Sequence, residues 1–233
     1  MDKVERDPLP ALLIVLTVVT GLVDAVSVLG LGRVFTANMT GNVVFLGFAA
    51  AGAEGFSIPR CVMALVGFIA GAALGGRLGL ALSSGSRRRW LLTVAVFESG
   101  LFFAAALIAT GYDVESLTPA SPLHALIVLT AVAMGLRNAT VRRLAIPDLT
   151  TTVLTLTVTG LAADSALAGG MNPRWARRLA SVAAIFVGAA FGAVLLFDVG
   201  LSMTLFFTGA LVLLATLAYA AHPASAAVAS PAG

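Results

Sequence analysis

Two carboxylates lie inside long apolar stretches of this 233-residue chain: Asp24 in the first stretch, and Glu98 in the run VAVFESGLFF. Ionisable residues in such stretches are costly to bury, and they normally face a cavity, a charged partner or a proton path. Both acids are therefore candidates for proton coupling. Structural alternatives stay open. Asp24 would hydrogen-bond a neighbouring helix or cap the segment that follows, and Glu98 would pair with Arg77 or Arg137.

A second group of polar residues lies in and next to the run Met39–Asn42 (MTGN). Its members are Asn38, Thr40 and Asn42, at every second position. A helix beginning near Thr40 would present free backbone N–H groups and the positive end of its dipole, which suit an anion or a polar ligand. Gly41 would let the backbone approach that ligand closely. The same side chains would also be needed only to satisfy an interrupted backbone, and both interpretations stay open.

A third group is the threonine-rich run PDLTTTVLTLTVTGLAAD, which begins at Pro147. Its threonines would form the wall of a site opposite the first polar group. The same site would include Asn138, which stands in the second half where Asp24 stands in the first. The predicted binding residues for a small solute are Asp24, Asn38, Thr40, Gly41, Asn42, Asn138, Thr151, Thr152 and Thr155.

The composition determines which elements must position these residues. Hydrophobic residues make up 59% of the chain and charged residues 11%, and the mean hydropathy is +1.02. Soluble domains carry roughly 45–50% apolar and about 25% charged residues. Lipid is the solvent that suits this composition, and only helices or closed barrels span it. We therefore predict an all-α integral membrane protein that forms a single membrane domain over residues 1–233.

Eight apolar stretches are visible, and a spanning helix needs about 20 apolar residues. Six of them meet that need, whereas 34–53 and 147–166 are rich in Asn and Thr. Irregular backbone at membrane depth is tolerated where protein or a water-filled cavity surrounds it. We therefore predict six transmembrane helices and two re-entrant or broken half-helices. The stretches are 11–31, 34–53, 62–82, 90–110, 123–141, 147–166, 179–197 and 201–221.

The arginines support this count, because basic residues mark the cytoplasmic side of a membrane protein. If 147–166 dips in and returns, the basic clusters on both of its sides stay cytoplasmic, together with both chain termini. The stretch 11–31 is longer than the 7–15 residues of a signal-peptide core, so it stays as the first helix. The basic residues expected on the cytoplasmic side are Lys3, Arg6, Arg87, Arg88, Arg89, Arg137, Arg142, Arg143, Arg174, Arg177 and Arg178.

The two halves of the chain also resemble each other. Residues from Gly21 onward align with residues from Gly135 onward, which places Asp24 on Asn138. VGFIAGAALG, beginning at Val66, aligns with VGAAFGAVLL, beginning at Val187. Repeats of about 11–110 and 123–221 with three crossings each would have inverted topology. Many secondary transporters have this architecture, with a site at discontinuous helices near the midplane.

The stretch GLVDAVSVLGLGRVFTANMTGNVVFLG from Gly21, with MTGN inside it, resembles the signature of the YoaK family of bacterial membrane proteins. The stretch MGLRNATVRRLAIPDLTTTVLTLTVTGLAADS from Met134 is also similar to that family's pattern. The resemblance implies a protein of about six spans in the bacterial inner membrane. It implies no biochemical role, because the family is of unknown function.

These observations favour a secondary transporter or permease for a small polar or anionic solute, with proton coupling through Asp24 or Glu98. A channel is a close alternative, and a non-transporting membrane scaffold or assembly protein is an alternative from another class. An enzyme is not expected, because His124 and His222 have no acid or Cys at ligand spacing and Cys61 is alone. No metal, cofactor or nucleic acid is expected. The partners are the lipid bilayer and the solute, and a homodimer is compatible with the chain length.

Overall fold

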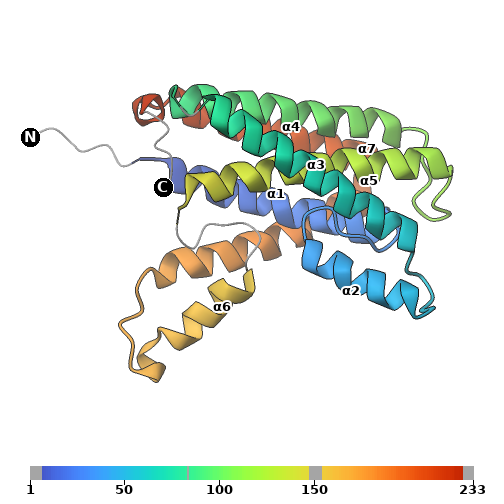
Figure 1. Cartoon of the computed structure of the whole chain (residues 1–233), viewed down its shortest axis with the longest axis horizontal. Helices are drawn as coiled ribbons and strands as arrows, with labels where there is room; N and C mark the ends of the chain where they lie inside the picture. Colours follow the sequence, from blue (N-terminus) through green and yellow to red (C-terminus); the bar gives the residue numbers. More distant parts are fainter. Residues whose placement is uncertain (1–6, 83, 147–153, 228–233) are drawn as a thin grey trace, which may run out of the picture.

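The structure, a computed structural model, describes residues 7–82, 84–146 and 154–227. Within these residues the regular elements are helices, and the long ones pack lengthwise as a bundle (Figure 1). This confirms the all-α prediction. The helices are α1 (Leu9–Gly30), α2 (Met39–Ala50), α3 (Ile58–Leu82), α4 (Arg87–Ala109), α5 (Ala120–Leu144), α6 (Leu154–Ala163), η1 (Ala166–Ala168), α7 (Trp175–Ala221) and η2 (Pro223–Ala226).

The long helices extend by up to about one turn beyond the apolar stretches that predicted them. Hydropathy detects the part of a helix that faces lipid, whereas backbone hydrogen bonds continue into the polar ends. At the start of α4, for example, the Ser86 hydroxyl accepts a hydrogen bond from the backbone N–H of Arg89 at 3.3 Å. This N-cap places the three arginines Arg87–Arg89 in the first turn of the helix.

Among the described residues, five helices are long and apolar enough to cross a membrane: α1, α3, α4, α5 and α7. Their outward faces carry large apolar side chains. Ile69 on α3 is 64% exposed, and Phe186 and Leu214 on α7 are 73% and 64% exposed. Such surfaces are rare on soluble proteins and normal where lipid covers them.

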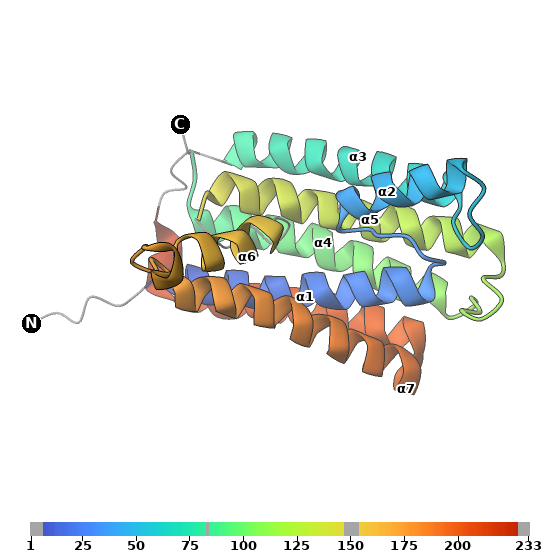
Figure 2. The same ribbon diagram turned by 90° about the horizontal axis from the view of Figure 1, so that it is seen from below.

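Element α7 consists of two helical parts, which correspond to the predicted stretches 179–197 and 201–221 and are separated by non-helical backbone at Gly200. Gly200 has φ 84° and ψ 171°, a conformation open essentially only to glycine. Leu196 and Leu201 flank the interruption, and both contact the position of Gly30 at the end of α1. Figure 2 shows the two parts of α7 on the side of the bundle where α1 lies.

The two ends of the described chain meet at one end of the bundle. Arg87 at the start of α4 forms an ion pair with Asp7 at 2.6 Å and donates a hydrogen bond to the Ala224 carbonyl at 3.2 Å. Its neighbour Arg88 donates to the Ser225 hydroxyl at 3.1 Å. Tyr219, near the end of α7, places its ring 5.8 Å from the guanidinium carbon of Arg87. The start of α1, the start of α4 and the end of α7 therefore lie together.

Two pairs of long helices approach each other closely enough that only glycine fits. A Cβ on Gly188 of α7 would lie 2.0 Å from the carbonyl oxygen of Val18 in α1. A Cβ on Gly71 of α3 would lie 2.1 Å from the carbonyl oxygen of Val132 in α5. Small residues at such crossings are typical of helix packing in membranes.

Helices α2 and α6 are too short to cross a membrane, at 12 and 10 residues. Helix α2 packs on α3, and α6 packs on α7. Both views show that each short helix begins toward the middle of the long axis and runs toward an opposite end of the bundle (Figures 1 and 2). The first residues of the predicted sixth stretch, 147–153, lie outside the described residues.

Candidate functional site

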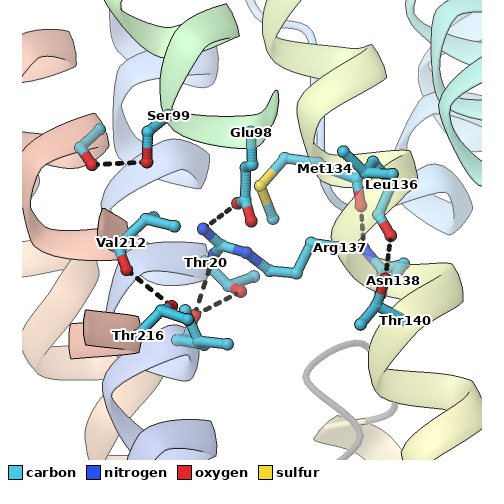
Figure 3. Close-up of polar contacts among 12 residues, drawn as sticks. Thr20, Glu98, Ser99, Met134, Leu136, Arg137, Asn138, Thr140, Val212 and Thr216 are labelled. Carbon is cyan, nitrogen blue, oxygen red and sulfur yellow. Dashed lines mark hydrogen bonds and ion pairs between the residues drawn. The ribbon is translucent and has the colours of Figure 1, made fainter. Parts of the chain in front are cut away.

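The interior of the bundle contains an ion pair between Glu98 of α4 and Arg137 of α5, whose side chains are 2% and 1% exposed. Figure 3 shows the Arg137 side chain reaching from α5 toward Glu98. One terminal nitrogen, Nη2, contacts the Glu98 carboxylate, and the other, Nη1, donates to the Leu16 carbonyl of α1 at 3.1 Å. The Thr20 hydroxyl donates to the same carbonyl at 3.0 Å. The pair thus connects α1, α4 and α5.

This geometry decides between the two partners predicted for Glu98. Arg137 is the partner, whereas Arg77 lies exposed on α3. The prediction that Arg137 marks the cytoplasmic end together with Arg142 and Arg143 is wrong. Arg137 precedes the last residue of α5 by seven positions, about 10 Å of helix rise, and its side chain is turned into the bundle.

A small cavity of about 20 Å³ lies beside the ion pair, with room for about one water molecule. Thr140 and Thr216 are the uncharged polar residues that line it, and their hydroxyls donate to Leu136 and Val212 of their own helices. Within the described part of the chain the Nε of Arg137 is buried without a hydrogen-bond acceptor. The remaining lining is apolar, from Leu12, Leu13, Leu16, Leu91, Val94, Ala95, Val141 and Leu144.

Asp24 is partly buried in α1, and its Oδ1 atom is enclosed without a hydrogen-bond partner among the described residues. The two structural roles considered for Asp24 do not account for this oxygen. Asp24 does not cap the following short helix, because Asn38 does so. The hydrogen bond that Ser27 donates goes to the Asp24 backbone carbonyl, not to its carboxylate. Asp24 is thus the predicted site residue whose carboxylate has the least structural explanation.

The MTGN motif, by contrast, holds the interrupted backbone together. Asn42 is fully buried, and its side chain accepts a hydrogen bond from the Phe35 N–H at 2.9 Å and donates one to the Phe35 carbonyl. Asn38 accepts from the Gly41 N–H at 3.3 Å as the N-cap of α2. A Cβ on Gly41 would lie 2.5 Å from the Phe35 ring. For Asn38, Gly41 and Asn42 the structural interpretation therefore explains the observed contacts.

The other predicted binding residues are dispersed. Thr40 on α2 and Thr155 on α6 are exposed. Asn138 donates to the Met134 carbonyl of its own helix at 2.8 Å (Figure 3). Thr151 and Thr152 lie outside the described residues. Among the described residues, α2 and α6 are not packed on each other, because α2 packs on α3 and α6 packs on α7.

Arg137 is the buried charged residue of this cluster that the sequence alone assigned to the membrane boundary. A signal was present, because an ionisable residue within a membrane helix is a functional candidate by default. It was obscured by Arg142 and Arg143, which follow within two turns and mark a membrane boundary. Among the described residues, no group of three or more His, Cys, Asp or Glu side chains is placed to hold a metal ion.

The apolar helices and the charges buried among them define a multi-pass α-helical membrane protein. The chain belongs to the family described as protein of unknown function (DUF1275), whose model matches residues 12–218. It is 33% identical over 153 residues to the UPF0700 transmembrane protein YoaK of Bacillus subtilis (strain 168). The match covers 66% of this chain and 65% of the relative, just under two thirds of the relative's length. The resemblance to the YoaK family is thereby confirmed. No solved structure matches the chain.

Proposed function

We propose that this protein is a secondary transporter or permease for a small polar or anionic solute, not an enzyme. The observation that carries the proposal is the partly buried carboxylate of Asp24 in an apolar helix, whose enclosed Oδ1 atom has no hydrogen-bond partner among the described residues. An inert bundle would avoid or satisfy such a group, because an unpaired polar atom in a membrane costs stability. The charges of Glu98 and Arg137 support the same proposal, with proton coupling assigned to Asp24 or Glu98.

The proposed topology has six crossings, with α7 contributing two that are separated at Gly200. This topology is supported by the non-helical backbone at Gly200. The part before Gly200 contacts α1 through Gly188, and the part after it contacts α4, where the Ser202 hydroxyl donates to the Ala106 carbonyl at 2.7 Å. Helices α2 and α6 would then be re-entrant, each entering as a non-helical chain and leaving as a half-helix.

Two inverted repeats are supported by a matched set of contacts. A Cβ on Gly21 of α1 would lie 2.2 Å from the carbonyl oxygen of Ile185 in α7. A Cβ on Gly135 of α5 would lie 2.1 Å from the carbonyl oxygen of Phe68 in α3. The α1–α7 contact is therefore repeated by the α5–α3 contact, as the alignment of Gly21 with Gly135 requires.

The equivalence of α3 and α7 residues that the helix contacts favour is offset from the sequence alignment by one helical turn. The contacts favour pairing Gly71 with Gly188, since a Cβ on Gly71 would meet the Val132 carbonyl and one on Gly188 the Val18 carbonyl, whereas the alignment paired Gly71 with Gly192. Apolar stretches rich in Gly and Ala align almost equally well at such offsets. Backbone contact is the more discriminating criterion.

We assign the end of the bundle where Asp7, Arg87 and Ser225 meet to the cytoplasm of a bacterial cell, with the protein in the inner membrane. The positive-inside rule supports this assignment. Arg143 at the end of α5 also lies at this end, because its side chain contacts the position of Gly79 near the end of α3, beside Trp90 of α4.

A membrane scaffold is the second candidate, and a specific observation favours it. Asn38, Gly41 and Asn42 are all engaged in holding the start of α2, so the family-like motif needs no ligand to explain it. A scaffold offers no role for the unpartnered oxygen of Asp24, which is why transport is preferred. A homodimer is compatible with both functions.

The two functions differ in what Asp24→Asn would do. We expect the variant to lose solute flux and to keep the thermal stability of the wild type, because the unpartnered oxygen contributes no hydrogen bond to the fold. The measurement uses proteoliposomes that contain a pH-sensitive dye and receive gradients of lactate, phosphate or glycine. At least one gradient should give a dye signal in the wild type that Asp24→Asn lacks.

Asn138→Asp is the matched control, since it places an acid at the equivalent position of the second half and retains Asp24. It should keep a flux above that of Asp24→Asn. If the wild type gives no signal with any of the three solutes and Asp24→Asn lowers the melting temperature, the transport proposal fails and the scaffold is favoured.

A further inference from the structure

We propose that Arg137 binds a small monocarboxylate anion, and that Glu98 is the resident counter-ion that this anion displaces. The inference rests on the proposed transport function and names the substrate class. The geometry that carries it is the buried contact of the Arg137 guanidinium with a carboxylate, next to a cavity that both side chains line. The solute site predicted from the sequence is near Asp24 and α2, so this site lies elsewhere in the bundle.

The chemistry of the guanidinium selects the anion. A guanidinium presents donors in a planar fork that matches a carboxylate, and it keeps its charge when buried. At Arg137 one terminal nitrogen already contacts the Glu98 carboxylate, and the Nε has no acceptor among the described residues. A second carboxylate entering from the cavity could therefore accept a hydrogen bond from the Arg137 Nε and could replace the Glu98 carboxylate at Nη2.

The lining of the cavity sets the size of the ligand. At about 20 Å³ the cavity admits little more than a water molecule while Glu98 holds its place. Movement of the Glu98 side chain would enlarge it. Leu12, Leu16 and Leu91 line the same space, and these side chains suit a short alkyl group rather than a second charge. Acetate has this combination of one carboxylate and one methyl group.

Charge balance dictates how the exchange proceeds. Glu98 and Arg137 are the charged residues that line the cavity; α1 contributes leucines, and Thr140 and Thr216 are the polar residues from α5 and α7. If the anion binds Arg137 while Glu98 stays ionised, the Glu98 carboxylate becomes an unpaired buried charge, which is strongly unfavourable. Glu98 must therefore accept a proton as the anion binds. One anion and one proton enter together, and the net charge of the site is unchanged.

The test measures melting temperature of the purified full-length protein in detergent, with sodium acetate as the probe. Glu98→Gln removes the competing carboxylate and leaves Arg137 charged. We expect acetate to stabilise this variant with a half-saturating concentration at least about tenfold below that of the wild type, because a bound ligand stabilises the folded state. Between pH 8 and pH 6 the wild-type affinity should rise about tenfold per pH unit, through proton uptake by Glu98. The Glu98→Gln affinity should not change with pH.

Three controls make the result specific. Acetamide has the shape of acetate without its charge and should stabilise neither protein, and sodium chloride at equal ionic strength should not replace acetate. Arg77→Gln, which removes an exposed arginine of a membrane helix, should respond as the wild type does. If Glu98→Gln does not fold, the double variant Glu98→Gln/Arg137→Gln should lack the acetate response that the wild type has at pH 6.

The proposal is overturned if acetate stabilises wild type and Glu98→Gln at the same concentration, if acetamide or chloride works equally well, or if the double variant keeps the response. Failure of this site and failure of transport remain distinguishable. If solute flux is observed but acetate binding does not depend on Arg137, the proposed site is wrong and the transport function stands. If acetate binds as expected but no solute crosses the membrane of the proteoliposomes, the binding site stands and the transport function is wrong.

Discussion

Replacement of Arg137 by glutamine alone is expected to lower the free energy of unfolding by about 3–5 kcal/mol, because it leaves the Glu98 carboxylate buried without its cation. The Leu16 carbonyl would also lose the charged donor that it accepts from at 3.1 Å. Unfolding by increasing fractions of sodium dodecyl sulfate in mixed micelles measures this quantity. The fluorescence of Trp90, which is buried beside Leu136, reports it.

The double variant Glu98→Gln/Arg137→Gln is expected to recover most of that loss. Both charges are then absent, and the two amides can hydrogen-bond each other across the same gap. Arg77→Gln is the matched single substitution at an exposed position, and it should stay within about 0.5 kcal/mol of the wild type. An Arg137→Gln variant as stable as Arg77→Gln would show that the ion pair does not form in the folded protein.

Replacement of Gly21 by alanine is expected to destabilise the protein by about 1–3 kcal/mol, the range found for overpacked cores. The added Cβ would lie 2.2 Å from the Ile185 carbonyl oxygen and 2.8 Å from the Ala189 nitrogen. Both are backbone atoms, so helices α1 and α7 would have to separate. The same detergent titration measures the loss.

Gly135→Ala should cost a similar amount, because its Cβ would meet the Phe68 backbone at 2.1 Å in the equivalent contact between α5 and α3. Gly100→Ala is the control, since nothing lies within 4 Å of the added atom. It should be neutral or slightly stabilising, as alanine favours a helix over glycine. A large loss at Gly21 with none at Gly135 would argue against matched halves.

Much of the fold followed from the sequence, because lipid imposes a strong and simple constraint on helix length. The ends of α1, α3, α4 and α5 were each anticipated to within about one helical turn, and α2 was expected to begin near Thr40, one residue from its observed start at Met39. The interruption of α7 at Gly200 lies between the predicted stretches 179–197 and 201–221, so the break between these two helical parts was also anticipated.

The candidate site was harder to predict, because partner choice depends on how helices rotate about their axes. Glu98 was selected and Arg137 was named as one of two partners, yet hydropathy cannot decide which arginine turns inward. The MTGN motif has polar side chains that would suit a ligand equally well. The contacts of Asn42 with the Phe35 backbone, which the sequence does not reveal, indicate that the motif stabilises the non-helical chain before α2.

The proposed architecture depends on α2 and α6 returning to the side from which they enter, and cysteine labelling tests this most directly. In a Cys61→Ser background, cysteines at the exposed positions Glu54, Glu115, Ser84 and Leu167 would be treated with a membrane-impermeant maleimide in intact spheroplasts. We expect labelling at positions 54 and 115 from outside, and labelling at 84 and 167 only after the membrane is opened. Labelling of position 167 from outside, or of positions 54 and 84 from the same side, would contradict the architecture.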